Sequence, residues 1–146
     1  MIVIVSNPKD RVYSQLIDLE FEICYHLVLK KDMGSLKVIE LTLKKLQSSF
    51  KGMKEQSEWA STILGDNQTV KVYYYYTDEN AKNVLKKLAD SLYNWIQPHL
   101  PEDLSFFKNG KACLITSSHE TESFIDTHYE IKKVLSIPGL KAHIEE

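Results

Sequence analysis

The residues best suited to chemistry lie in a short polar run near the C-terminus, around His119 and Glu120. An imidazole beside a carboxylate can act as a general base or bind a metal ion. Glu122 would lie one helical turn from His119, but position 123 is a serine, so the run is not the metal-binding pattern His-Glu-x-x-His. The alternative is that His119 and Glu120 only polarise the start of a helix, where acidic side chains are favoured.

Three acidic residues near this run, Glu122, Asp126 and Glu130, are spaced four residues apart. A helix over residues 121–136 would place them on one stripe, where like charges cost roughly a few tenths of a kcal/mol per pair. Such an acidic ridge suits a basic partner, so we expect it to belong to a partner-binding surface together with His119 and Glu120. The alternative is that the acids complement the helix dipole, which explains Glu130 less well than the other two.

A run of four tyrosines lies in the strongest predicted strand, residues 70–77. Alternate strand residues share a face, so Tyr73 and Tyr75 lie together and Tyr74 lies on the other side. Tyrosine is enriched in the energetic centres of protein interfaces. We therefore predict Tyr73 and Tyr75 as further partner-binding residues; the alternative is a central strand that is buried on both faces.

Other reactive motifs are missing from the sequence. It has no glycine-rich phosphate loop, no Cys-x-x-Cys, no Gly-x-Ser-x-Gly and no histidine pair at metal-ligand spacing. Ser117 lies near His119, but no signal for an oxyanion hole accompanies it. Cys24 and Cys113 lie in apolar contexts and are expected to be buried free thiols. No catalytic residue, metal site or cofactor is therefore predicted.

Composition narrows the class of partner. The chain has 146 residues, 43% hydrophobic and 26% charged, with a net charge of −2, which gives no long-range attraction to nucleic acid or to anionic membranes. Arg11 is the only arginine, although arginine is the usual residue for phosphate and base-edge contacts. No apolar run approaches the roughly 20 residues needed to span a bilayer, and residues 1–5 lack the features of a signal peptide. We expect a cytoplasmic protein that binds neither nucleic acid nor membrane.

Apolar periodicity predicts the elements of one α+β domain over residues 1–146. We expect a small, mainly antiparallel sheet with a C-terminal β-hairpin, covered by four to five helices. The hairpin signal is Asn109-Gly110, a pair that suits a type I′ turn. Helices are expected over residues 9–31, 35–52, 53–64, 78–97 and 121–136, strands over 2–5, 70–77 and the hairpin arms, and a weakly ordered tail over 140–146. The predicted core comprises Leu16, Leu19, Ile23, Leu43, Leu46, Val72, Tyr74, Leu88, Leu92, Phe106, Leu114 and Phe124.

The segment from Leu100 to Glu120, which begins Leu-Pro-Glu-Asp-Leu-Ser and ends Thr-Ser-Ser-His-Glu, resembles a segment of small bacterial proteins. Some of these look like immunity proteins of bacterial toxin systems. The resemblance covers about a seventh of the chain, and Ala112-Cys113 replaces an expected aromatic residue in the second strand. It implies a protein that masks a toxin, and it transfers no catalytic residue.

The leading hypothesis is a small bacterial interaction protein, an immunity or antitoxin-like module whose partner is a basic, toxin-like protein. One alternative is a small enzyme or metal-binding domain that uses His119 with Glu120 or Glu122. Another is a subunit of a homo-oligomer.

Overall fold

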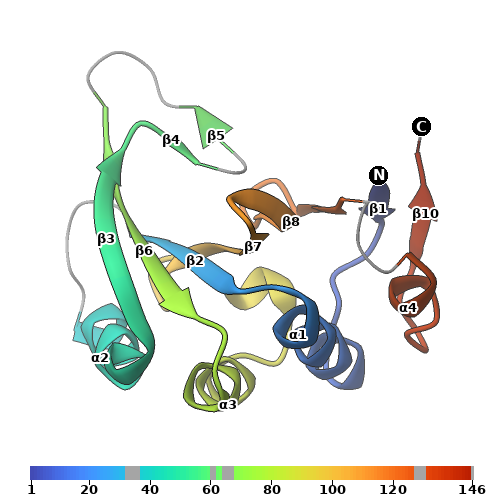
Figure 1. Ribbon diagram of the computed structural model, residues 1–146, viewed down its shortest axis with the longest axis horizontal. Helices are drawn as coiled ribbons and strands as arrows, with labels where there is room; N and C mark the ends of the chain where they lie inside the picture. Colours follow the sequence, from blue (N-terminus) through green and yellow to red (C-terminus); the bar gives the residue numbers. More distant parts are fainter. Residues whose placement is uncertain (32–36, 60–61, 64–67, 127–130, 146) are drawn as a thin grey trace.

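A twisted antiparallel sheet of eight strands forms the centre of the chain in the computed structural model, which describes residues 1–31, 37–59, 62–63, 68–126 and 131–145 (Figure 1). The fold is a single α+β domain, as expected, but its sheet has eight strands instead of being the small sheet that the sequence predicts. The strand order is β10-β1-β9-β8-β7-β2-β6-β3. These strands are β1 (Ile2–Ile4), β2 (His26–Lys31), β3 (Phe50–Gln56), β6 (Val70–Tyr76), β7 (Glu102–Lys108), β8 (Lys111–Ser117), β9 (Glu122–Ile125) and β10 (Ala142–Ile144).

The helices of the described residues pack on one face of this sheet, below it in Figure 1. They are α1 (Arg11–Ile23), α2 (Lys37–Lys45), α3 (Glu79–Leu88) and α4 (Ile131–Leu135), with 3-10 turns η1 (Gln47–Ser49) and η2 (Leu92–Asn94). A separate two-stranded ladder of β4 (Glu58–Trp59) and β5 (Thr62–Ile63) projects on the opposite side.

The first predicted helix is too long, because residues 26–31 form a strand. Helix α1 ends at Ile23, where the Cys24 N–H donates to the Glu20 carbonyl oxygen at 2.8 Å. Leu27 then pairs with Tyr75 on one side and with Phe106 on the other. Leucines in this segment fit both a helical and an extended pattern, and pairing with two neighbouring strands decides for the sheet.

The hairpin is confirmed, and its turn has the expected chemistry. Asn109 and Gly110 have φ of 52° and 78°, the two left-handed conformations that a type I′ turn needs. The chain then turns again, through Thr121 at φ 52°, into a third strand, β9. The predicted helix over residues 121–136 is therefore wrong: β9 pairs with β8 and β1, residues 127–130 lie outside the described part, and α4 begins only at Ile131.

Three other expectations need correction. The predicted helix over 53–64 is wrong, because its described residues belong to β3, β4 and β5. The helix expected over 78–97 ends at Leu88 and is followed by the turn η2. The tail is not loosely ordered: β10 pairs with β1, and the N–H of Glu145 donates to the Met1 carbonyl oxygen at 2.8 Å.

The main core lies between the sheet and the helices, and hydrogen bonds of one buried tyrosine link three of its elements. The Tyr13 hydroxyl donates to the Leu85 carbonyl oxygen at 2.7 Å and accepts from Trp95 Nε1 at 2.9 Å, so it joins α1, α3 and η2. Burial raises the pKa of Tyr13, which keeps the hydroxyl protonated. Phe21 of α1 meets Phe106 of β7 edge to face, with centroids 5.5 Å apart.

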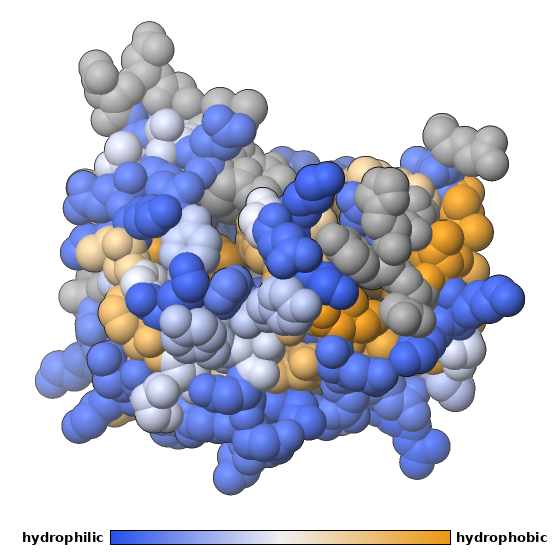
Figure 2. Space-filling model, viewed as in Figure 1, coloured by the Kyte–Doolittle hydropathy of each residue, from blue (hydrophilic) through white to orange (hydrophobic). Residues whose placement is uncertain are grey.

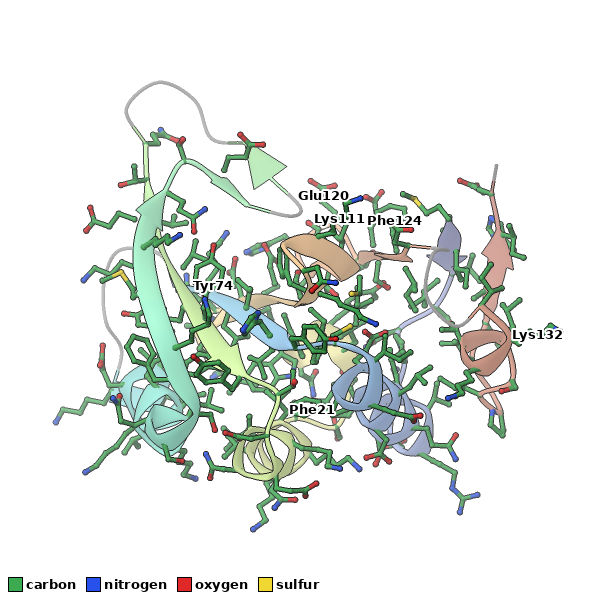
Figure 3. The ribbon with its side chains drawn as sticks, in the orientation of Figure 1. Phe21, Tyr74, Lys111, Glu120, Phe124 and Lys132 are labelled. Carbon is green, nitrogen blue, oxygen red and sulfur yellow. The ribbon has the colours of Figure 1, made fainter. Side chains whose placement is uncertain are left out.

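Most of the predicted core is confirmed. Seven of its residues are buried, namely Leu16, Leu19, Leu46, Val72, Leu92, Phe106 and Leu114, and Ile23, Leu43 and Leu88 are partly buried against the core. Tyr74 and Phe124 were placed wrongly. Both are only half-buried and lie on the face of the sheet away from the helices, as Figure 3 shows.

We predict that Tyr13→Phe lowers the free energy of unfolding by about 1–3 kcal/mol, because the buried Leu85 carbonyl loses its donor and Trp95 Nε1 loses its acceptor. Urea unfolding followed by circular dichroism measures this loss. Tyr25→Phe is the matched control, since Tyr25 is 52% exposed. Equal stability of the two variants would contradict the role of this hydroxyl.

Candidate functional site

A charged cluster lies where β2, β7 and the β8–β9 turn meet. Lys30 Nζ is 3.1 Å from Glu102 Oε2 and 3.8 Å from Asp103 Oδ2. Glu102 Oε1 is 2.8 Å from Nε2 of His119, which belongs to the turn. Glu102 and Asp103 are almost completely buried, whereas the His119 side chain is 64% exposed. The imidazole is therefore the part of the cluster that meets solvent.

Backbone irregularity brings both carboxylates to one lysine. Lys30 pairs with Glu102, but the register between β2 and β7 shifts between Val28 and Lys30. Asp103 has φ of 58°, which is unusual for a residue other than glycine. In a regular strand, neighbouring side chains point to opposite faces, so this departure lets Glu102 and Asp103 contact the same ammonium group. Strained backbone of this kind is concentrated at functional sites.

Main-chain donors hold the same carboxylates. The Gln97 N–H donates to Glu102 Oε1 at 3.2 Å, and the Ser118 N–H donates to Asp103 Oδ1 at 3.0 Å. Each buried carboxylate thus has a cationic contact and a backbone donor, which compensates for its loss of water. The second of these bonds ties the turn that carries His119 to the start of β7.

The sequence identified His119 but not its partner. Glu102 lies seventeen residues before it, and the pair forms only because β7 and β8 fold back on each other. The available signals were a lysine inside the apolar run 27–30 and two adjacent acids at the start of an apolar strand. Both patterns predict charged side chains within buried strands, but neither shows which charged residues will form an ion pair.

The other predicted acidic residues do not form a helical ridge. Glu120 is exposed in the β8–β9 turn, and Glu122 is exposed at the start of β9. Asp126 is half-buried just after β9, and its N–H donates to the Cys113 carbonyl oxygen at 2.9 Å. Glu130 lies outside the described residues. The predicted stripe is wrong because Glu122 belongs to strand β9 and Asp126 follows that strand, so residues four apart here do not share a helical face.

The tyrosine strand has the opposite orientation from the one expected. Tyr73 and Tyr75 face the helices, where Tyr75 is 1% exposed and Tyr73 is partly buried against the main core. Burial raises the pKa of Tyr75. The prediction that these two residues present hydroxyl groups to a partner is thus wrong for Tyr75. Tyr74 and Tyr76 lie on the other face, where Tyr74 packs against the buried Val28, Val70 and Val72.

Apolar and aromatic side chains surround the charged cluster on that side. We call this surface the open face and define it by Val3, Tyr74, Phe107, Ile115 and Phe124, which are all half-buried. Ile115 pairs with Phe124, and Phe124 pairs with Val3, while their neighbours Leu114, Ile125 and Ile2 point into the main core. Figure 3 shows Tyr74, Phe124 and Glu120 on the side away from α1 and α3.

The space-filling view shows hydrophilic atoms at the upper left as well as along the lower edge (Figure 2). Figure 2 shows a hydrophilic lower edge, where the helices lie, and hydrophobic atoms toward the middle and right, over the terminal strands. Met1, Val5 and Ile144 near the termini are each at least half exposed.

Within the described residues, Glu102 is the side chain that His119 contacts. Among the described residues, no group of three or more histidine, cysteine, aspartate or glutamate side chains is placed to hold a metal ion. The carboxylate that His119 contacts already faces Lys30 and a backbone N–H.

A second buried group lies on the covered side of the sheet. Glu20 of α1 is 2% exposed, and its Oε2 accepts a hydrogen bond from Cys24 Sγ at 3.2 Å. Burial raises the pKa of Glu20 to about 7, against a smaller opposing effect of the Cys24 bond. Cys24 and Cys113 are buried free thiols, as expected. The hydrogen bond with Cys113 is the largest cause that raises the pKa of the Cys24 thiol, and burial raises this pKa further.

Comparison of the chain with known protein families, curated proteins and solved structures gives no match. In the part of the chain that the structure describes, no helix has the length and apolar character to cross a membrane.

We predict that Glu102→Ala lowers the free energy of unfolding by about 3–5 kcal/mol, because it removes one partner of a buried ion pair. His119→Ala should change it by less than about 1 kcal/mol, since the imidazole is exposed. Chemical unfolding of both variants measures the difference. Similar losses from the two substitutions would contradict the assignment of Glu102 as the centre of the cluster.

We also predict a pH dependence that comes from Glu20. In the unfolded chain this carboxyl ionises near 4.5, whereas the folded protein keeps it protonated up to about pH 7. The folded state binds more protons in this window, so stability falls as pH rises from 4.5 to 7 and levels off above it. The full loss is roughly 3 kcal/mol.

Glu20→Gln should remove this slope and be more stable than the wild type at pH 8. Asp18→Asn is the control, because Asp18 lies on the same helix and is half exposed in its ion pair with Lys86. Thermal unfolding between pH 4.5 and 8 measures the profiles. An unchanged slope in Glu20→Gln would refute the assignment.

Proposed function

We propose that the chain is a protein-binding module of immunity type, and that its open face receives the partner. The observation that carries the proposal is the one-sided helical cover of the sheet. It leaves aromatic and aliphatic side chains half-buried around a fixed charged cluster. An apolar surface with a rigid polar centre supplies both the contact area and the orientation that a specific interface requires.

The size of the sheet supports a protein as the partner. With neighbouring strands about 4.8 Å apart, eight strands span roughly 34 Å, and the longest extend about 20 Å. The resulting area, roughly 700 Å², is comparable with the about 800 Å² that each protein contributes to a standard interface.

The exposed acidic residues at the edge of the open face, near His119, favour a basic partner there. Glu120 and Glu122 are both exposed there. Exposed charges of this kind chiefly accelerate and orient association, while the apolar centre provides affinity. The sequence resemblance to immunity proteins agrees with this, since it implies a protein that masks a toxin.

The alternatives have less support. His119 contacts Glu102 instead of Glu120 or Glu122, so the pairs on which the enzyme and metal-binding hypotheses depend are not formed. A homo-oligomer that uses the open face remains an alternative, and measurement of molecular mass distinguishes it from binding to another protein.

We predict that Phe124→Gln and Glu120→Lys each weaken binding of a natural partner by about tenfold or more, which corresponds to about 1.4 kcal/mol. The partner is captured from cells of the source organism with the wild-type protein and identified by mass spectrometry. It is then purified and titrated against each variant.

Matched controls lie on the other side of the molecule. Leu135→Gln and Glu79→Lys change exposed residues of α4 and α3, so they should leave affinity unchanged. Circular dichroism verifies folding of all four variants. Equal affinity of open-face and control variants would refute the proposal, and a concentration-dependent mass that Phe124→Gln abolishes would favour the homo-oligomer.

A further inference from the structure

Helix α2 carries more apolar residues than the core needs. Ile39 is buried, as is Leu46 just after the helix, and Leu43 is partly buried against the core. Val38 and Leu41 lie on another stripe of the same helix and are 51% and 58% exposed. Residues 38, 41, 42 and 45 share this stripe, because positions three and four apart lie on one helical face.

This second stripe forms one wall of a cavity of about 590 Å³. The opposite wall comes from the end of α3 and from the segment after η2, with Leu88, Ile96 and Leu100 as its apolar members. A volume of this size is within the range of small-molecule sites, which are mostly apolar with a few polar groups. The cavity lies on the helical side of the sheet, so it is separate from the open face.

The described polar side chains that line the cavity are basic or neutral. Lys45 and His99 contribute basic groups, Asn94 and Thr42 contribute neutral groups, and no acidic residue lines the cavity within the part of the chain that the structure describes. Asn94 Nδ2 already donates to Asp90 at 2.6 Å, and the Thr42 hydroxyl donates to the Val38 carbonyl oxygen at 3.4 Å. Lys45 forms no ion pair within the described part of the chain, so its ammonium group is free to meet an anion.

We propose that this cavity binds a small amphiphilic carboxylate, with the acid group at Lys45 and the apolar chain between Leu41 and Ile96. Apolar walls exclude a fully hydrated anion, and a cation at the rim excludes a cationic amphiphile. His99 can donate a second hydrogen bond to the carboxylate from the opposite wall. The basic groups therefore select a carboxylate as the end group of the ligand, and the apolar walls select a hydrocarbon chain.

The probe is decanoate, kept below its micelle-forming concentration and titrated by calorimetry into the wild-type protein. We expect saturable binding of one equivalent, and weaker binding of decanol and of decyltrimethylammonium. Lys45→Glu should weaken decanoate binding by about tenfold or more, because a charge-assisted hydrogen bond is replaced by repulsion. Lys44→Glu is the matched control, since it is the neighbouring lysine and does not line the cavity.

A second pair of variants tests the apolar wall. Leu41→Gln should weaken decanoate binding several-fold, whereas Leu135→Gln, at another exposed leucine, on α4, should not. Both sites are exposed, so the fold is expected to tolerate the changes. Absence of saturable binding, equal affinities for Lys45→Glu and Lys44→Glu, or tighter binding of an acidic peptide than of decanoate would overturn the proposal.

Discussion

The contact of Lys30 with Glu102 and Asp103 constrains the rest of the open face. A lysine in the middle of a sheet is costly to bury unless a carboxylate meets it. The irregular start of β7 brings two carboxylates to it, and the same carboxylates hold the β8–β9 turn through Ser118 and His119. The position of His119, and of the exposed Glu120 beside it, thus follows from a charge pair between the neighbouring strands β2 and β7.

One-sided helical cover divides the molecule into two surfaces with different chemistry. On the covered side, Tyr13, Leu85 and Trp95 satisfy one another inside a dry core, and the surplus apolar residues of α2 border a cavity with basic groups. On the open side, polar groups are buried among half-exposed apolar ones. The first arrangement suits a small ligand and the second suits a protein, because the available area differs so widely.

Local structure was predictable at positions where the backbone conformation or the cap accepts only a few residue types. Asn109-Gly110 specifies a type I′ turn because few other pairs tolerate two positive φ angles, and the hairpin followed. The side-chain cap that Asp78 provides to the Ala81 N–H marks the start of α3 in the same way. The strand conformation of residues 26–31 and 122–125 was not predictable, since leucine, isoleucine and phenylalanine occur in both helices and strands.

The sequence by itself determined the α+β class, the hairpin and most of the core, because these depend on local propensity and on hydrophobic burial. Only the tertiary structure decided that Glu102 is the partner of His119, that Tyr75 is buried while Tyr74 is not, and that Val38 and Leu41 border a cavity. Contacts between distant residues depend on strand order and register. A shift of one residue in register exchanges the two faces of a strand, and the pattern of a single strand does not encode which face its neighbours will cover.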